Sequence, residues 1–116
     1  MKLLLAVLVL VLVVETQAQW HQYPGQAIDG AKDMFLAYQD MREANWKNSD
    51  KYFHARGNYD AASRGPGGRW AAEVISYFIL NLVKYSDAEA DQEANRWGRN
   101  SGDPNRYRPK GLPEKY

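Results

Sequence analysis

The chain has 116 residues, of which 45% are hydrophobic and 25% are charged, and it contains no cysteine. Its 15 basic and 14 acidic residues leave a formal net charge of +1, so the dense basic face of a nucleic-acid-binding protein is not expected. Without disulfides, a domain this small must be stabilised by packing, by self-association or by a bound ligand.

The first 18 residues have the pattern of a secretory signal peptide. A basic residue precedes an apolar run, 3–14, and small residues follow up to Ala18, where cleavage is expected. A membrane anchor is the alternative, but this run is too short for a bilayer core, whose crossing takes about 20 residues. The predicted boundaries are therefore 1–18 for the signal peptide, 19–98 for the domain and 99–116 for a Pro- and Gly-rich tail.

Apolar residues recur at steps of three and four from 26 to about 45, which predicts an amphipathic helix. A second helix is predicted from 51 to about 63, with Ser49 or Asp50 as its cap. Gly57 lies inside this helix, where glycine is unfavourable, so another helix is expected to approach closely at that point.

The run 65–68, Gly-Pro-Gly-Gly, predicts a chain reversal. A third helix, from 69 to about 85, is apolar on nearly all sides and therefore requires burial or lipid. Ser86 and Glu89 have the spacing of a capping box for a fourth helix, which is expected to end at Gly98. The predicted fold is an all-α four-helix bundle with an extended C-terminal tail.

The tail has a composition that is usually disordered. The alternative is that four of its side chains bind helix ends and clamp the bundle. These residues are Arg106, Tyr107, Arg108 and Tyr116.

Seventeen consecutive residues, 55–71, resemble the signature segment of the serum amyloid A family of secreted lipid-binding proteins. The similarity continues in 29–34, 40–45, 49–54, 90–92, 94–95, 97–99 and 111–116. The resemblance implies a bundle wrapped by its C-terminal tail, and an acute-phase apolipoprotein in the extracellular space. As partners it implies high-density lipoprotein and phospholipid, retinol within an oligomer, sulfated glycosaminoglycans, and cell-surface receptors for cytokine-like signalling.

Two stretches differ from the family pattern. Residues 77–80 are apolar, where the family usually carries acidic, small and basic side chains, and the segment 85–91 is shorter than expected. We expect these differences to strengthen lipid affinity or aggregation. The run 74–80 has high β propensity, no charge and no proline, which is typical of a segment that forms fibrils.

The candidate lipid-binding surface consists of apolar residues on the first and third helices. These residues are Ile28, Ala31, Phe35, Tyr38, Trp70, Val74, Ile75, Phe78 and Ile79. The alternative is that they form the core of the bundle. The third helix, however, has more apolar surface than one core-facing stripe can use, and such a surplus indicates an interaction site. Self-association is expected to cover the same faces when lipid is absent.

Two other functions use similar surfaces. The first alternative is an oligomeric carrier of a small hydrophobic ligand such as retinol. An antimicrobial helical protein is a further alternative, but it would need a more cationic face than this chain has.

Lys32, Arg64 and Arg69 are candidate ligands for sulfated glycosaminoglycans, and the alternative is that they are scattered solvated charges. No catalytic, cofactor or metal site is predicted, because His21 and His54 are the only histidines and no cysteine is available. His54 is expected at the surface or in a hydrogen bond between helices.

Overall fold

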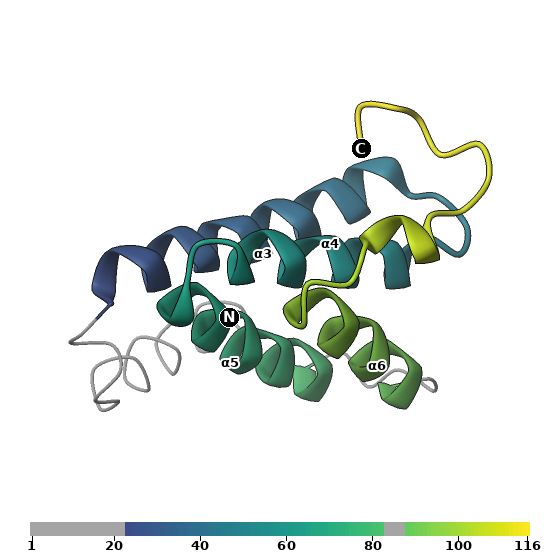
Figure 1. Ribbon diagram of the computed structural model, residues 1–116. Coiled ribbons are helices and arrows are strands. Elements are labelled where there is room, and N and C mark those ends of the chain that lie inside the picture. The colour runs from purple at the N-terminus through teal and green to yellow at the C-terminus, as the bar shows by residue number, and fades with distance from the viewer. Residues whose placement is uncertain (1–22, 83–87) are drawn as a thin grey trace.

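The computed structural model describes residues 23–82 and 88–116, which form four α-helices and a short 3-10 helix (Figure 1). The elements are α3 (Pro24–Ala44), α4 (Asp50–Ala62), α5 (Pro66–Leu82), α6 (Ala88–Arg99) and η1 (Pro104–Tyr107). The described residues contain no strand, and the predicted all-α bundle with an extended tail is confirmed. Within these ranges, no helix is both long enough and apolar enough to cross a bilayer.

The core is built where α3, α4 and α5 meet. Met34, Ala61, Ala72 and Ile75 are all at most 4% exposed and pack together there. A Cβ atom on Gly57 would lie 2.9 Å from the Cβ atom of Ala37, closer than side chains normally approach. The predicted close approach of a second helix at Gly57 is therefore confirmed.

The chain reversal between α4 and α5 is confirmed, but it is shorter than predicted. Gly65 has a φ of +120°, and Pro66 then begins α5 three residues before the expected start at Arg69. Proline is well suited to the first helical position, because the amide hydrogen that it lacks would have no partner there. Gly68 therefore lies in the first turn, and the missing side chain of Gly30 lets α3 contact it there, because a Cβ atom on Gly30 would lie 2.6 Å from the Gly68 Cα atom.

One predicted helix end is wrong, and one predicted cap is in place without its side-chain hydrogen bond. Gly98 does not end α6 but lies inside it, because the helix backbone passes so close to Ala55 that a Cβ atom on Gly98 would collide with that residue's carbonyl oxygen. Ser49 precedes α4 but makes no capping hydrogen bond through its side chain, since its backbone is already helical, with φ −94° and ψ −10°. The predicted capping box at Ser86 and Glu89 lies partly outside the described residues.

The tail is ordered and packs on the bundle, as the clamp hypothesis predicts. Its last residue returns to the end of α3 (Figure 1). There, Lys115 Nζ and the Tyr116 hydroxyl lie 2.8 and 2.9 Å from Glu43 Oε1. On α4, the Tyr52 hydroxyl donates to the Tyr116 carbonyl oxygen and accepts a hydrogen bond from Arg108. Of the other two predicted clamp residues, Tyr107 packs on the cluster around Tyr52 and Phe53, and Arg106 lies 4.4 Å from the Trp97 ring centroid.

Candidate lipid-binding surface

Helix α3 buries one apolar stripe and leaves a second group of apolar side chains outside. Ala27, Met34 and Ala37 are at most 4% exposed. By contrast, Ile28 is 50% exposed and Phe35 is 41% exposed, one position away from the buried stripe. These two predicted lipid ligands lie seven residues apart and therefore share one face of the helix.

The predicted residues of α5 are divided between core and surface. Ile75 is only 2% exposed and belongs to the core cluster, so in this conformation it faces the bundle interior. Trp70, Val74 and Phe78 are half-buried at the margin of the bundle. The side chain of Ile79, the last predicted residue on α5, lies outside the described part of the structure.

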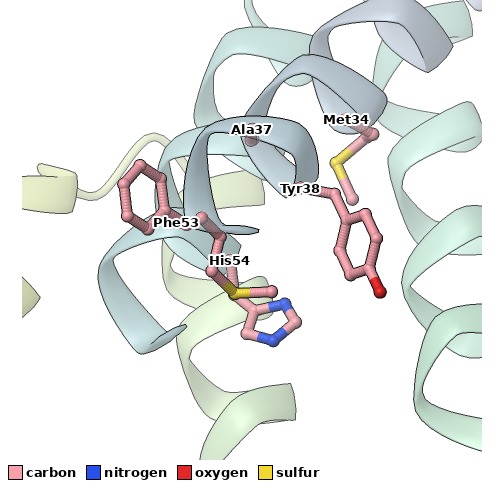
Figure 2. Close-up of a pocket in the computed structure, with 7 residues that line it drawn as sticks. Met34, Ala37, Tyr38, Phe53 and His54 are labelled. Atoms are coloured by element: carbon pink, nitrogen blue, oxygen red, sulfur yellow. The ribbon is translucent and has the colours of Figure 1, made fainter. Parts of the chain in front are cut away.

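The remaining two predicted residues on α3 point inward. Ala31 packs on the core cluster formed by Met34, Ala61, Ala72 and Ile75. Tyr38 lines a crevice between α3 and α4, together with Phe53 and His54 (Figure 2). The crevice has a volume of about 10 Å³, which is about the space that one water molecule needs.

Two large exposed apolar residues were missed by the sequence analysis. Leu36 on α3 is 53% exposed, and Tyr77 on α5 is 61% exposed, with its ring in edge contact with that of Phe78. Neither was among the candidate lipid ligands, which were taken from one stripe on each helix, although the run 77–80 was noted as apolar. The available signal was their size and apolar character at positions where a solvated helix normally carries polar residues.

Two of the three candidate glycosaminoglycan ligands bind other groups of the chain, and the role of all three stays a prediction. Arg64 binds Asp33 through two hydrogen bonds of 2.8 and 3.1 Å, and this contact raises the pKa of the guanidinium. Arg69 donates to the Arg99 carbonyl oxygen and to the Asn100 side chain. Lys32 is exposed and has no ion-pair partner in the described part of the chain.

His54 is buried between α4 and α6, which agrees with the inter-helix role predicted for it. Its Nε2 atom lies 3.8 Å from Asp91 Oδ2, and Lys51 Nζ lies 3.4 Å from Asp91 Oδ1. Asp91 has no exposed surface, so a carboxylate is held inside the bundle by side chains of the neighbouring helix. In residues 23–82 and 88–116, no group of three or more His, Cys, Asp or Glu side chains is arranged to hold a metal ion.

Comparison with known proteins gives consistent matches along the chain. The model of the family described as serum amyloid A protein matches residues 21–116. The serum amyloid A-2 protein of Neovison vison is 54% identical over 129 aligned positions that cover all of both chains. The serum amyloid A-3 protein of Oryctolagus cuniculus is 63% identical over 103 positions and 84% of each chain. The serum amyloid A protein of Bos taurus is 52% identical over 130 positions and the whole of both chains.

The full-length alignments have more positions than this chain has residues, so these relatives carry residues that it lacks. A shortened segment 85–91 was predicted, which is consistent with a chain that lacks residues present in these relatives.

Proposed function

Because the chain belongs to the serum amyloid A family, we propose that it binds the phospholipid surface of high-density lipoprotein through the outer faces of α3 and α5. Members of this family are acute-phase apolipoproteins and not enzymes, and the family associates with lipoproteins. The predicted resemblance is confirmed. The specific lipid partner, the surface that binds it and secretion of this chain are proposals.

The exposure of Ile28 and Phe35 carries this proposal. Both are large apolar residues on one face of α3, and about half of each remains in water. Moving apolar area out of water stabilises a complex by roughly 25 cal/mol per Å². A helix that already packs on its other side can therefore gain further burial at a headgroup boundary without giving up its core contacts.

The same helix carries polar groups suited to an interface. Lys32 and Gln39 are exposed and lie on the same side of α3 as Ile28 and Phe35, at spacings of three, four and seven residues. Apolar side chains flanked by a long basic side chain are typical of helices that lie in the plane of a membrane surface.

The direct test measures lipid binding of a variant that changes only the exposed face. The double variant Ile28→Asp/Phe35→Asp is expected to bind small phosphatidylcholine vesicles at least about tenfold more weakly than the parent protein, because two apolar contacts are replaced by carboxylates. Binding is measured by flotation in a density gradient and by the vesicle-induced change in far-UV circular dichroism.

Trp46→Asp is the matched control. Trp46 is 39% exposed, close to the value for Phe35, but it lies in the loop between α3 and α4. Equal loss of binding in both variants would show that the added charge matters rather than the proposed face.

The size of the vesicles gives a second test. The protein should bind small vesicles better than large ones, because strong curvature opens headgroup packing. Equal binding to both sizes would contradict the proposal.

A carrier of retinol is the second function to be considered. The crevice between α3 and α4 is far smaller than the pockets of several hundred Å³ that hold such ligands, so a carrier would need another cavity, such as one formed between copies of the chain. Self-association without lipid, binding of sulfated glycosaminoglycans and receptor signalling stay predictions.

A further inference from the structure

The crevice between α3 and α4 brings together side chains that bind soft metal ions. It is lined by Met34 and Met41 of α3 and by His54 of α4. The sequence contains three methionines and two histidines, and the others are Met1 and His21. Every methionine apart from the initiator therefore lies at this one crevice, together with the only histidine that the structure describes.

Helix geometry places these side chains against one another. Met34 and Met41 are seven residues apart and so lie on one face of α3. The Met34 sulfur lies 3.3 Å from the point that a Cβ atom on Gly57 would occupy, so the thioether rests directly against α4. His54 is three residues before Gly57 and shares its face of α4. The missing side chain of Gly57 thus makes room for a sulfur atom within one turn of the imidazole.

The crevice has the size of a single small ligand. Its volume of about 10 Å³ is about the space that one water molecule needs. A buried water also needs about two to four hydrogen-bonding partners, and this crevice is lined mostly by apolar side chains and by thioethers, which accept hydrogen bonds only weakly. A soft metal ion, which takes sulfur as a ligand, suits such a lining better than water does.

The imidazole of His54 is oriented like that of a metal-binding histidine. Its Nε2 atom lies 3.8 Å from Asp91 Oδ2, and Asp91 has no exposed surface. Figure 2 shows one ring nitrogen of His54 on the side of the other crevice residues and the second nitrogen turned away from them. A histidine that binds a metal through one nitrogen commonly presents the other to a carboxylate, which fixes the ring and the position of its proton. Asp91 is therefore placed to hold the ring with one nitrogen facing the crevice.

The ligand types select the metal. Thioether sulfur is a soft ligand that favours copper(I), whereas calcium and magnesium prefer oxygen, and zinc prefers imidazole, thiolate and carboxylate. Two thioethers and a neutral imidazole carry no negative charge. A monovalent ion consequently costs less to bury among them than a divalent ion does.

We propose that this crevice binds one copper(I) ion through the sulfur atoms of Met34 and Met41 and the crevice-facing nitrogen of His54. Tyr38 and Met41 are only half-buried, which gives the ion a route from solvent. The proposal does not depend on lipid binding, because the exposed apolar residues of α3 are not part of the lining.

Silver(I) is the first probe, because it shares the charge and the ligand preference of copper(I) and is stable in air. Silver nitrate is titrated into the lipid-free protein in chloride-free buffer, and nuclear magnetic resonance spectra follow the methyl groups of Met34 and Met41 and the ring of His54. These signals should shift together and saturate at one equivalent of silver. Zinc nitrate should leave the methionine methyl groups unchanged. Shifts that do not saturate, or that spare these three residues, would overturn the proposal.

Leucine substitutions separate metal binding from packing. Methionine also fills irregular gaps in protein cores, and Met34→Leu and Met41→Leu nearly conserve that volume while they remove the sulfur. Each should raise the silver Kd at least about tenfold and leave the circular dichroism spectrum unchanged. An unchanged Kd in the Met34→Leu/Met41→Leu double variant refutes the site.

Histidine variants provide a matched pair. His54→Gln removes the proposed imidazole ligand and should also raise the silver Kd at least about tenfold. His21→Gln removes the other imidazole of the chain and should leave the Kd unchanged. The opposite result would assign the metal to His21 and overturn the proposal.

Copper(I) itself is tested in the absence of oxygen. It is added as its acetonitrile complex, and it should shift the same methionine and histidine signals as silver does. The Met34→Leu/Met41→Leu variant should show no such saturable shift of the His54 ring. A parent protein that responds to silver but not to copper(I) would contradict the assignment of the metal.

Discussion

The two sides of the bundle are held together by different interactions. Where α3 meets α5, the core contacts are apolar or between glycines, as at Ile75 and at Gly30 with Gly68, and one hydrogen bond runs from the Gly67 amide to Gln26 Oε1. Where α4 meets α6, several buried side chains are polar, with Asn58 at the centre. Apolar contacts are non-directional and can be replaced by lipid, whereas a buried polar network needs one geometry.

Asn58 shows how complete this network is. Its side-chain nitrogen donates to the His54 carbonyl oxygen at 2.8 Å and to Asn95 Oδ1 at 2.9 Å. Its oxygen accepts from Ser76 Oγ at 3.3 Å and from Arg99 Nη1 at 3.0 Å. All four hydrogen-bonding positions of the amide are used, which ties α4 to both α5 and α6. We infer that this side stays assembled while the α3 and α5 surface exchanges partners.

The largest predicted effect concerns the apolar side. Ile75→Asp places a carboxylate in the core, and the cost of an unpaired buried charge, about 4 kcal/mol or more, should unfold a protein of this size. Leu36→Asp adds the same charge on α3 at a site that is 53% exposed, and should change the unfolding free energy by only about 0.5 kcal/mol. Urea denaturation of the two variants measures the difference. If both unfold alike, the division of apolar residues into core and surface is wrong.

A smaller effect is expected on the polar side. Asn58→Ala leaves the side chains of Asn95, Ser76 and Arg99 without their shared partner, and should lower the unfolding free energy by about 2 to 3 kcal/mol. Asn105→Ala, at an exposed position, is the control and should be nearly neutral. Thermal unfolding followed by circular dichroism compares them. A neutral Asn58→Ala would mean that water replaces the amide and that the network does not fix the arrangement of α4 and α6.

Helix number, order and approximate ends could be predicted from sequence because they depend on local periodicity and on breakers such as Pro66. The errors occur where tertiary contacts override local preference. Gly98 looks like a terminator in sequence, but in the structure its missing side chain admits the backbone of α4. The β-prone run 74–80 is helical, as the predicted third helix requires, and Ile75 and Ser76 are buried against other helices.

The candidate surface could be predicted only in part. Sequence identifies which residues are apolar but not how much of each remains exposed after packing, so Ile28 and Ile75 looked equivalent although one is 50% and the other 2% exposed. A cleft between α4 and the segment before η1, which Tyr59 and Asp103 help to line, could not be predicted. Its walls come from segments about 40 residues apart, and they meet only because the tail returns to α4.

The smallest predicted effect concerns the tail contact with α3. Hydrogen bonds from Lys115 and Tyr116 lower the pKa of Glu43 below its ordinary value of 4.5. A carboxyl group whose pKa is lower in the folded state stabilises the fold above its unfolded pKa, and this contribution disappears as the pH falls through the folded value. Glu43→Gln should therefore loosen the last two residues at pH 7 but match the parent protein in strong acid, where both side chains are neutral. The amide chemical shifts of Lys115 and Tyr116 report this release directly.

Salt gives a control for the same contact. Because the contact is solvent-exposed, high salt should weaken it in the parent protein and leave Glu43→Gln unchanged. Equal salt dependence in both proteins would mean that Arg108 and Tyr52, not Glu43, hold the end of the tail.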